Sequence, residues 1–277
     1  MNKIIPKVTV IITSRNEEVV IKRLIKSVKT QSYKNIEVIL VDNNSTDQTK
    51  QIAKKFKIDI YNIGPERSSQ RNFGAKISKG KYLLFLDADM KLSRHVIKEC
   101  VELMVSDKKI KLIVIPERSI ATDLWEKVKA YERYFYNLEG DSITDAARFF
   151  EKKIFFLACG FDETITGPED WDLPERIKKM GIKSGRVKST IDHFERIPSL
   201  YHLARKKFYY ALLADRYFTK NSIPIFGPKA IYFLRPVFYK NWRILISNPI
   251  LTFEMVIMLS IELFSGALGY LLGKYLR

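Results

Sequence analysis

The sequence predicts an α/β fold, in which helices flank a mostly parallel central sheet, followed by a helical C-terminal extension. In the first half of the chain, short apolar runs rich in β-branched residues alternate with segments of helical periodicity. After residue 199 this alternation stops, and basic, aromatic and finally apolar segments follow. We therefore expect one domain over residues 1–197 and a helical extension over residues 198–277.

The alternating half contains four predicted strands and three predicted helices. The strands are apolar on both faces, which is typical of parallel sheets that are covered by helices on both sides. The first predicted helix has apolar residues at Val20, Leu24, Ile25 and Val28. The second opens with Ser45 and Thr46, either of which can cap its N-terminus through its hydroxyl group. We expect strands at 8–13, 36–42, 58–63 and 81–87, and helices at 17–30, 45–56 and 68–78.

The composition limits the classes of protein to which the chain can belong. The chain has 277 residues, of which 46 % are hydrophobic, so it can bury a sizeable core. Its formal net charge of +17 requires an anionic partner, such as nucleic acid, a phosphorylated ligand or anionic lipid. Cys100 and Cys159 lie far apart, which argues against a disulfide framework. The apolar run near the N-terminus is too short for a secretory signal peptide and fits a first strand.

Polar residues stand at the carboxyl ends of the first, second and fourth predicted strands. The segment "TSRNE" (13–17) follows the first strand, Asp42 ends the second, and Asp87 and Asp89 end the fourth. In parallel sheets, ligands bind beyond the carboxyl ends of the strands. These three clusters therefore predict one binding site at one edge of the sheet.

Asp87 and Asp89 suggest a metal site. Residues i and i+2 of a strand point to the same face, so both carboxylates would aim at one spot if strand geometry continues that far. Two hard oxygen ligands suit Mg²⁺ or Mn²⁺. The alternative is a polar turn that closes the strand, since Asp is common in turns.

A second acidic cluster lies in "GPEDWDLPERI", where Glu169, Asp170 and Asp172 stand at a turn that enters a helix. Pro174 fits the first turn of that helix. One interpretation is that these acids do acid–base chemistry. The other is that they cap the helix N-terminus through a favourable interaction with its dipole.

Three segments carry a resemblance to a known family: "VTVIITSRNEEVVIKRLIKSVKTQSYKNIEVILVDNNSTDQT", "QRNFGAKISKGKYLLFLDADMKLS" and "ACGFDETITGPEDWDLPERIKKMG". They resemble family 2 glycosyltransferases of the GT-A fold, over residues 8–195. Each motif is short, but their order along the chain is specific. The resemblance implies a UDP- or GDP-sugar donor, a divalent cation (Mg²⁺ or Mn²⁺), and sugar transfer with inversion at the anomeric carbon. Cys159 stands where the family often has a glycine, and we expect the turn to form nevertheless.

The resemblance also implies roles for individual residues. Asp89 is the expected direct metal ligand, and Asp87 approaches the ribose or the metal. His193 stands where some relatives supply another metal contact, although a lone histidine is often structural. Asp170 is the implied base, and Glu169 orients or contacts the acceptor. The residues implied at the nucleotide sugar are Thr13, Arg15, Glu17, Asp42, Arg71, Asn72 and Asp87.

The segment 250–272 is almost wholly apolar and long enough to cross a bilayer. Glu254 and Glu262 interrupt it, and charges inside a membrane are costly. Glu262, Gly266, Gly269 and Gly273 would share one helical face, able to pack on another helix or a partner subunit. The basic, aromatic helix expected at 201–218 and the residues after it favour an anionic lipid surface. We expect membrane association, by spanning or by lying in the interface; the alternative is a buried helix of a soluble core.

These features together predict a metal-assisted glycosyltransferase at the membrane, with its catalytic domain on the cytoplasmic side. We expect a lipid-linked acceptor, a polyprenyl phosphate or diphosphate. One alternative is a noncatalytic membrane-bound scaffold of the same fold. Another is a basic nucleic-acid-binding protein, which is disfavoured because the chain shows no zinc-finger spacing and no aromatic RNA-binding strand signature. A dinucleotide-dependent oxidoreductase is disfavoured because "SRNEE", not a glycine-rich turn, follows the first strand.

Overall fold

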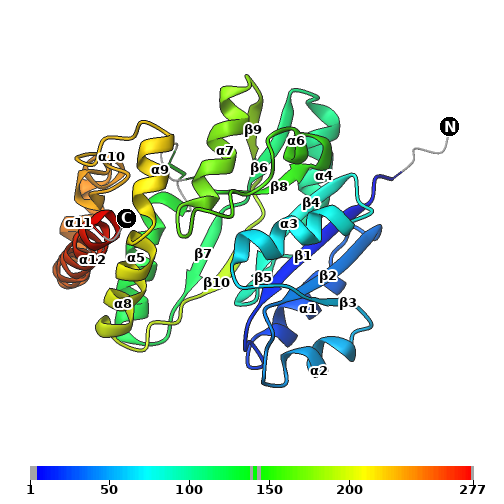
Figure 1. The fold of residues 1–277 in the computed structure, drawn as a ribbon, viewed down its shortest axis with the longest axis horizontal. Coiled ribbons are helices and arrows are strands. Elements are labelled where there is room, and N and C mark those ends of the chain that lie inside the picture. Colours follow the sequence, from blue (N-terminus) through cyan, green and yellow to red (C-terminus); the bar gives the residue numbers. More distant parts are fainter. Residues whose placement is uncertain (1–4, 138–139, 142–144, 276–277) are drawn as a thin grey trace. The chain divides into compact units, whose positions relative to one another are not determined.

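The computed structural model describes residues 5–137, 140–141 and 145–275 (Figure 1). The chain forms two compact units. Unit 1 consists of Met1–Glu117, Ala146–Glu163 and Leu173–His193. Unit 2 consists of Arg118–Asp145, Thr164–Asp172 and Phe194–Arg277. The domain boundary that the sequence predicts after residue 197 stays a prediction.

A seven-stranded sheet of order β3-β2-β1-β4-β8-β6-β9 forms the centre of unit 1. The strands β3, β2, β1 and β4 are parallel, β8 runs antiparallel to β4 and β6, and β9 is parallel to β6. A three-stranded sheet has the order β5-β10-β7. The strands are β1 (Val8–Ser14), β2 (Ile36–Asp42), β3 (Asp59–Asn62), β4 (Tyr82–Asp87), β5 (Met90–Leu92), β6 (Ile110–Val114), β7 (Glu117–Ile120), β8 (Ala147–Glu151), β9 (Lys183–Arg186) and β10 (Ile191–Phe194).

The mostly parallel α/β architecture confirms the predicted fold class. All seven elements expected in the first half are present. The first two helices are shorter at both ends than predicted, and the third is shifted by one residue. The helices of unit 1 are α1 (Ile21–Lys29), α2 (Thr49–Lys54), α3 (Arg67–Ile77), α4 (Val96–Ser106), α6 (Lys152–Leu157) and most of α7 (Glu169–Lys179).

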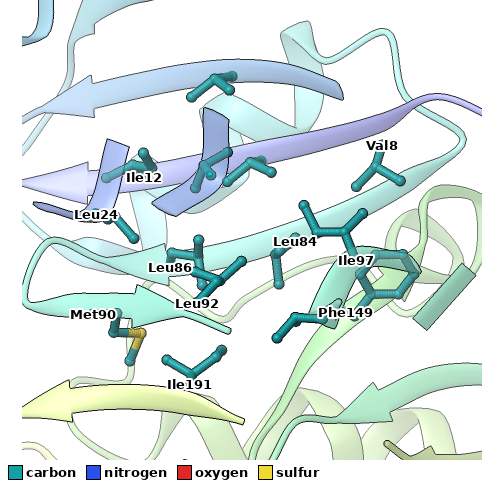
Figure 2. Close-up of a cluster of buried hydrophobic side chains, with 14 of the residues drawn as sticks. Val8, Ile12, Leu24, Leu84, Leu86, Met90, Leu92, Ile97, Phe149 and Ile191 are labelled. Atoms are coloured by element: carbon teal, nitrogen blue, oxygen red, sulfur yellow. The ribbon is translucent and has the colours of Figure 1, made fainter. Parts of the chain in front are cut away.

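Both faces of the central sheet are buried, as the two-sided apolar strands predicted. Along β1, Val8 and Ile12 belong to one core cluster, while Ile11, which points to the other face, belongs to a second. Figure 2 shows the first cluster, where Leu84 and Leu86 of β4 lie near Met90 and Ile191. Because helices cover both faces, polar groups can reach solvent mainly at the ends of the strands.

The first helix packs as its sequence predicts. Val20, Leu24, Ile25 and Val28 are all buried in the same core cluster as Val8. They recur at the three- and four-residue spacing of one helical face. This face holds α1 against the sheet, and the loop between β1 and α1 is thereby kept at the carboxyl edge of β1.

Unit 2 is mainly helical, and its core contains Val128, Phe135, Phe238 and Met258. The sequence predicted one continuous helix at 201–218. The structure has two helices there, so the prediction of a continuous helix was wrong. No glycine or proline marks the break at Leu212 and Leu213, so a sequence pattern could not have found it. The helices are α5 (Leu124–Asn137), α8 (Leu200–Ala211), α9 (Ala214–Lys220), the 3-10 helix η1 (Tyr232–Leu234), α10 (Pro236–Lys240), α11 (Trp242–Ser247) and α12 (Pro249–Tyr275).

Candidate active site

The carboxyl ends of β1, β2 and β4 meet at one edge of the sheet, as the sequence predicted. Thr13 of β1 is paired in register with Asp87 of β4. Ser14, the next residue, is paired with Asp42 of β2. This edge therefore brings the polar residues of three separate segments together within unit 1.

Asp87 binds a hydroxyl and two guanidinium groups. Its Oδ1 accepts hydrogen bonds from Nη2 of Arg71 at 3.0 Å and from Oγ1 of Thr13 at 3.3 Å. Its Oδ2 lies 3.5 Å from Nη1 of Arg148 on β8. Burial by itself would raise the pKa of Asp87, but Arg71, Arg148 and Arg67 outweigh burial and hold this pKa well below its usual range. Asp87 is therefore ionised at neutral pH.

A second set of contacts joins Arg148 to Glu117, His193 and Asp89. Nε of Arg148 donates to Oε1 of Glu117, and the other oxygen of Glu117 lies 2.9 Å from Nδ1 of His193. Nε2 of His193 lies 3.6 Å from Oδ1 of Asp89. Burial would raise the pKa of Glu117, but Arg148 and His193 outweigh it and lower this pKa below its usual range. Glu117 is thus a fixed anion that orients the His193 ring.

The pair of Asp89 and His193 fits a divalent cation. A metal-binding histidine commonly uses one ring nitrogen for the metal and the other for a carboxylate, which matches Nδ1 of His193 against Glu117. Among the residues described, no group of three or more His, Cys, Asp or Glu side chains could hold a metal by itself. Mg²⁺ usually takes one or two protein carboxylates and fills its other positions with phosphates and water. Asp87 faces guanidinium groups instead, and its metal role stays a prediction.

The loop after β1 is hydrogen-bonded to the loop after β2. The backbone N–H of Asn16, whose φ is 54°, donates to Oγ of Ser45 at 2.8 Å. The N–H of Glu17 donates to Oγ1 of Thr49 at 2.7 Å. The side chain of Arg15 is exposed in this loop, and that of Glu17 is partly exposed. These two of the predicted nucleoside residues are therefore accessible to solvent.

Asp42 is fully buried and accepts hydrogen bonds inside the chain. Oγ of Ser14 and Oγ of Ser45 donate to its Oδ1 at 2.7 and 2.6 Å, and the Ser45 N–H donates to its Oδ2 at 2.7 Å. This carboxylate therefore shapes the two loops. Its predicted contact with a nucleobase stays a prediction.

Asn72 holds the turn that follows α6. Its Nδ2 donates to the carbonyl of Phe161 at 2.8 Å, and its Oδ1 accepts from the Phe161 N–H at 2.9 Å. Gly160 has a φ of +64°, and a Cβ there would lie 2.7 Å from Oδ1 of Asn72, so a larger residue would disturb this contact. Cys159 adopts a φ of 61°, and the turn forms with cysteine as expected. The diphosphate contact implied for Asn72 stays a prediction.

Four residues of this site had no role predicted from the sequence. Arg148 interrupts the apolar strand "ARFFE", and Glu117 follows the apolar strand β6. A charged residue within or just after a buried strand was the sequence signal that could have identified both as site residues. Gln70 is buried in α3, where its Nε2 donates to the carbonyls of Ser14 and Val41. The same helix begins at Arg67, a half-buried cation whose charge acts on Asp87. Gln70 thus fastens α3 to the ends of β1 and β2.

The acids of the "GPEDWDL" segment belong to unit 2. They differ in burial and in hydrogen-bond partners. Glu169 is buried and accepts the Gly167 N–H at 2.6 Å through Oε2. Asp172 is fully buried, and Nδ2 of Asn221 and Nζ of Lys220 lie 3.1 and 3.3 Å from its oxygens. Asp170 keeps a partly exposed side chain.

The helix α7 begins at Glu169, which places Pro174 inside the helix, so the prediction of Pro174 in the first turn was wrong. The acids begin the helix instead, and capping through the dipole accounts for part of their clustering. Asp170 lies in unit 2 and Asp89 in unit 1, so their meeting at one substrate stays a prediction.

The sequence model of glycosyl transferase family 2 matches residues 9–162, more than half of the chain. The chain belongs to glycosyl transferase family 2. The match ends close to Phe161, so it includes the site built on β1, β2, β4 and β8 but ends before the acids of α7 and before His193.

This family 2 member is similar to curated proteins over part of its length. It is 32 % identical over 97 residues to the GalNAc(5)-diNAcBac-PP-undecaprenol beta-1,3-glucosyltransferase of Campylobacter jejuni, covering 31 % of each chain. It is 38 % identical over 87 residues to the UDP-Glc:alpha-D-GlcNAc-diphosphoundecaprenol beta-1,3-glucosyltransferase WfaP of Escherichia coli, covering 30 % of this chain and 35 % of that protein. The matches thus span about a third of these relatives.

Solved structures share the fold of this family 2 member at low sequence identity. The mannosyltransferase PcManGT of Pyrobaculum calidifontis, in complex with GDP-Man and Mn²⁺, aligns over 98 % of this chain and 85 % of its own with a TM-score of 0.59 and 16 % identity. TarS 1-349 of S. aureus, in complex with UDP-GlcNAc, aligns over 94 % and 90 % with a TM-score of 0.57 and 16 % identity.

Proposed function

We propose that this family 2 protein is an inverting glycosyltransferase that moves a sugar from a UDP- or GDP-sugar to a lipid-linked acceptor at the membrane. The observation that carries the proposal is the group of acidic, basic and histidine side chains at the carboxyl ends of β1 and β4. There Asp87 binds Arg71, and Asp89 faces His193. Such a group, at the edge where parallel sheets bind ligands, suits an anionic nucleotide with a cation.

The donor would be bound by residues of unit 1. Arg71 is 1 % exposed and bonded to Asp87, so its task is to fix that carboxylate. Arg67 is better exposed and begins α3, where backbone N–H groups also favour an anion. We therefore assign the diphosphate contact to Arg67 and the α3 N-terminus, and the nucleoside to Arg15 and Glu17. In support, the P. calidifontis neighbour holds GDP-Man with Mn²⁺, and the S. aureus neighbour holds UDP-GlcNAc.

The chemistry requires charge neutralisation at the leaving group and one base at the acceptor. A divalent cation held by Asp89 and His193 would supply positive charge at the departing nucleoside diphosphate. Where the acceptor carries a sugar, Asp170 accepts the proton of the attacking hydroxyl, since it is the more exposed acid of its cluster. A bare polyprenyl phosphate attacks through an oxygen that is already ionised, and this step then needs no base. Glu169 and Asp172, which are buried, hold the segment in place.

The acceptor would be a polyprenyl phosphate or diphosphate, alone or carrying a sugar. The two curated relatives named above act on undecaprenol-linked substrates according to their names. The apolar helix α12 and these relatives suggest membrane association of this chain. The net charge of +17 favours an anionic surface, and we place the catalytic part on its cytoplasmic side.

A donor screen tests this proposal. We expect purified protein with Mn²⁺ to gain thermal stability from UDP or GDP, since a ligand that binds only the folded state stabilises it. The matching nucleotide sugar should then transfer its sugar to a polyprenyl phosphate in detergent, with inverted anomeric configuration by NMR. Asp89→Asn should lose the nucleotide-dependent gain in Mn²⁺. Stabilisation by neither nucleotide, or a product with retained configuration, would contradict the proposal.

A further inference from the structure

The outer surface of α12 is apolar and exposed. Phe253, Phe264 and Leu268 are 67 %, 75 % and 54 % exposed, and Leu271 and Leu272 are 50 % and 45 % exposed. Between residues 250 and 272, the exposed residues of this helix include no charged side chain. A helix on a soluble protein carries polar residues on its outer face. We call these five side chains the outer face of α12.

The inner face of α12 carries a buried acid that is paired with two lysines. Oε1 of Glu262 accepts a hydrogen bond from Nζ of Lys129 on α5 at 2.8 Å, and its Oε2 lies 3.6 Å from Nζ of Lys207 on α8. Glu262 is only 3 % exposed. The charge of the acid near the middle of the apolar helix is therefore paired within unit 2 itself.

The C-terminal half of α12 runs beside α8 in backbone contact (Figure 1). A Cβ at Gly269 would lie 2.3 Å from the carbonyl oxygen of Phe208, and one at Gly273 would lie 2.1 Å from that of Leu212. The glycines therefore let the two helices approach as closely as their backbones allow. The small face found in the sequence packs on a helix of the same unit.

This packing does not suit a helix that crosses a bilayer. The helix has 27 residues and a mean hydropathy of 1.9 in its most apolar window, so by length and composition it could cross. However, α8 lies along it and carries Arg205, Lys206 and Lys207. A crossing α12 would bring these cations toward the hydrocarbon, where they are costly.

The residues just before α12 match the chemistry of a lipid headgroup region. Tyr239 and Trp242 are 61 % and 53 % exposed, and Lys240 and Arg243 beside them are exposed too. They belong to α10 and α11, and α11 packs against α12. Tyrosine and tryptophan settle at membrane interfaces, and lysine and arginine attract anionic headgroups.

We propose that α12 is an in-plane anchor, which lies in the interface of an anionic bilayer with its outer face among the acyl chains. The helix then stays packed on α8, and it does not cross the membrane. This inference rests on the proposed function only in placing the protein at a membrane. It deepens that proposal by naming the surface and the orientation.

Vesicle flotation of the full chain tests the surface. We expect binding to vesicles of phosphatidylcholine with phosphatidylglycerol, and weaker binding to phosphatidylcholine alone. The variant Phe264→Asp/Leu271→Asp should lose about tenfold or more of its vesicle affinity. The control Val105→Asp/Met180→Asp makes the same change at exposed apolar residues of unit 1 and should bind like the original chain. Equal binding by both variants would overturn the proposal. It would also be overturned if the original chain did not bind vesicles but formed a dimer without lipid, and if Phe264→Asp/Leu271→Asp dissociated that dimer.

Labelling tests the orientation. A chain with Cys159→Ser and Tyr275→Cys is synthesised without cells beside sealed vesicles of the same composition, and a membrane-impermeant maleimide is added outside. For an in-plane helix, labelling of residue 275 is the same before and after detergent. Labelling that requires detergent would show a crossing helix and overturn the proposal. Nucleotide-dependent stabilisation in Mn²⁺ is measured on the original chain and on every variant. Its absence from the original chain would count against the proposed function and not against the anchor, and its retention by the variants shows that their nucleotide site is intact.

Discussion

Arg71 donates a hydrogen bond from Nη2 to Oδ1 of Asp87 across 3.0 Å, from a side chain that is 1 % exposed. This bond fixes the carboxylate at the end of β4. We expect Arg71→Met to lower the free energy of unfolding by about 2–3 kcal/mol, because it removes a charge-assisted bond and leaves Asp87 with fewer partners. Lys76→Met, on the exposed side of the same helix, should change it by less than about 0.5 kcal/mol. Urea denaturation of both variants measures the difference, and equal effects would contradict it.

Glu117 is expected to control cation affinity through His193. Its Oε2 lies 2.9 Å from Nδ1 of His193, so Glu117→Gln weakens the bond that orients the ring. The Mn²⁺ concentration needed for half-maximal nucleotide-dependent stabilisation should rise by about 10- to 100-fold. Asp192→Asn alters a neighbouring acid that points to the other face of β10, and it should leave this concentration unchanged. A purely structural Glu117 would lower stability in both the presence and absence of Mn²⁺ without changing that concentration.

Asp170 and Asp172 should respond differently to the same substitution. Asp170→Asn is expected to lower kcat by about 10²- to 10⁴-fold with little change in Tm, because it removes the base. Asp172→Asn disturbs a fully buried carboxylate that Lys220 and Asn221 bind, and should cost about 1–3 kcal/mol of stability. Single-turnover kinetics and thermal denaturation separate the two effects. Full turnover by Asp170→Asn would show that another group, or the acceptor phosphate itself, takes the proton.

The Glu262 ion pair makes stability depend on acid pH. Burial would raise the pKa of Glu262, but Lys129 and Lys207 outweigh burial and lower it from 4.5 to about 2. A carboxyl group with a lowered folded-state pKa adds stability that is fully present above its unfolded pKa and is lost as the pH falls from about 4.5 to about 2. Glu262→Gln should therefore cost on the order of 3 kcal/mol near neutral pH, and less at acid pH.

Urea denaturation across this pH range gives the measurement for Glu262. Ser260→Ala, which changes an exposed and non-titrating residue of α12, is the control and should alter stability by the same amount at every pH in this range. If Glu262→Gln lowered the free energy of unfolding by the same amount from neutral to acid pH, the carboxylate charge would not be what stabilises the unit.

The glycines of α12 offer a steric test within one helix. A Cβ at Gly273 would lie 2.1 Å from the Leu212 carbonyl oxygen, whereas at Gly266 its nearest neighbour would be Cγ of Lys207 at 3.6 Å. We expect Gly273→Ala to destabilise the chain by about 1–3 kcal/mol, because α8 and α12 must separate. Gly266→Ala should be neutral or stabilise by up to about 1 kcal/mol, since alanine favours the helix. Similar Tm values for the two variants would contradict the close packing.

The parallel part of the fold could be predicted from sequence because its signals are local. Each of β1, β2 and β4 is a short apolar run, and α1 shows its buried face in four residues. The same patterns place Asp42, Asp87 and Asp89 at strand ends. Parallel neighbours follow from the alternation of strands and helices, without knowledge of any single contact.

The antiparallel strand β8 and the contacts it supplies could not be predicted in this way. Arg148 lies 61 residues along the chain from Asp87, and His193 lies 76 from Glu117. No periodicity relates residues so far apart, and the choice of neighbour is made by packing. The roles of Arg71 and Asn72 show the same limit. Their positions in a motif were visible, but the partners Asp87 and Phe161 were not.

The register of β1 between β2 and β4 also has a practical consequence. Because side chains alternate along a strand, a slip of one residue would turn Thr13 and Ser14 away from Asp87 and Asp42. A misaligned molecule could keep its helical content and still lack the nucleotide site. Stoichiometric titration with a nucleoside diphosphate would therefore count the properly assembled fraction of any preparation, which spectroscopic measures of secondary structure would miss.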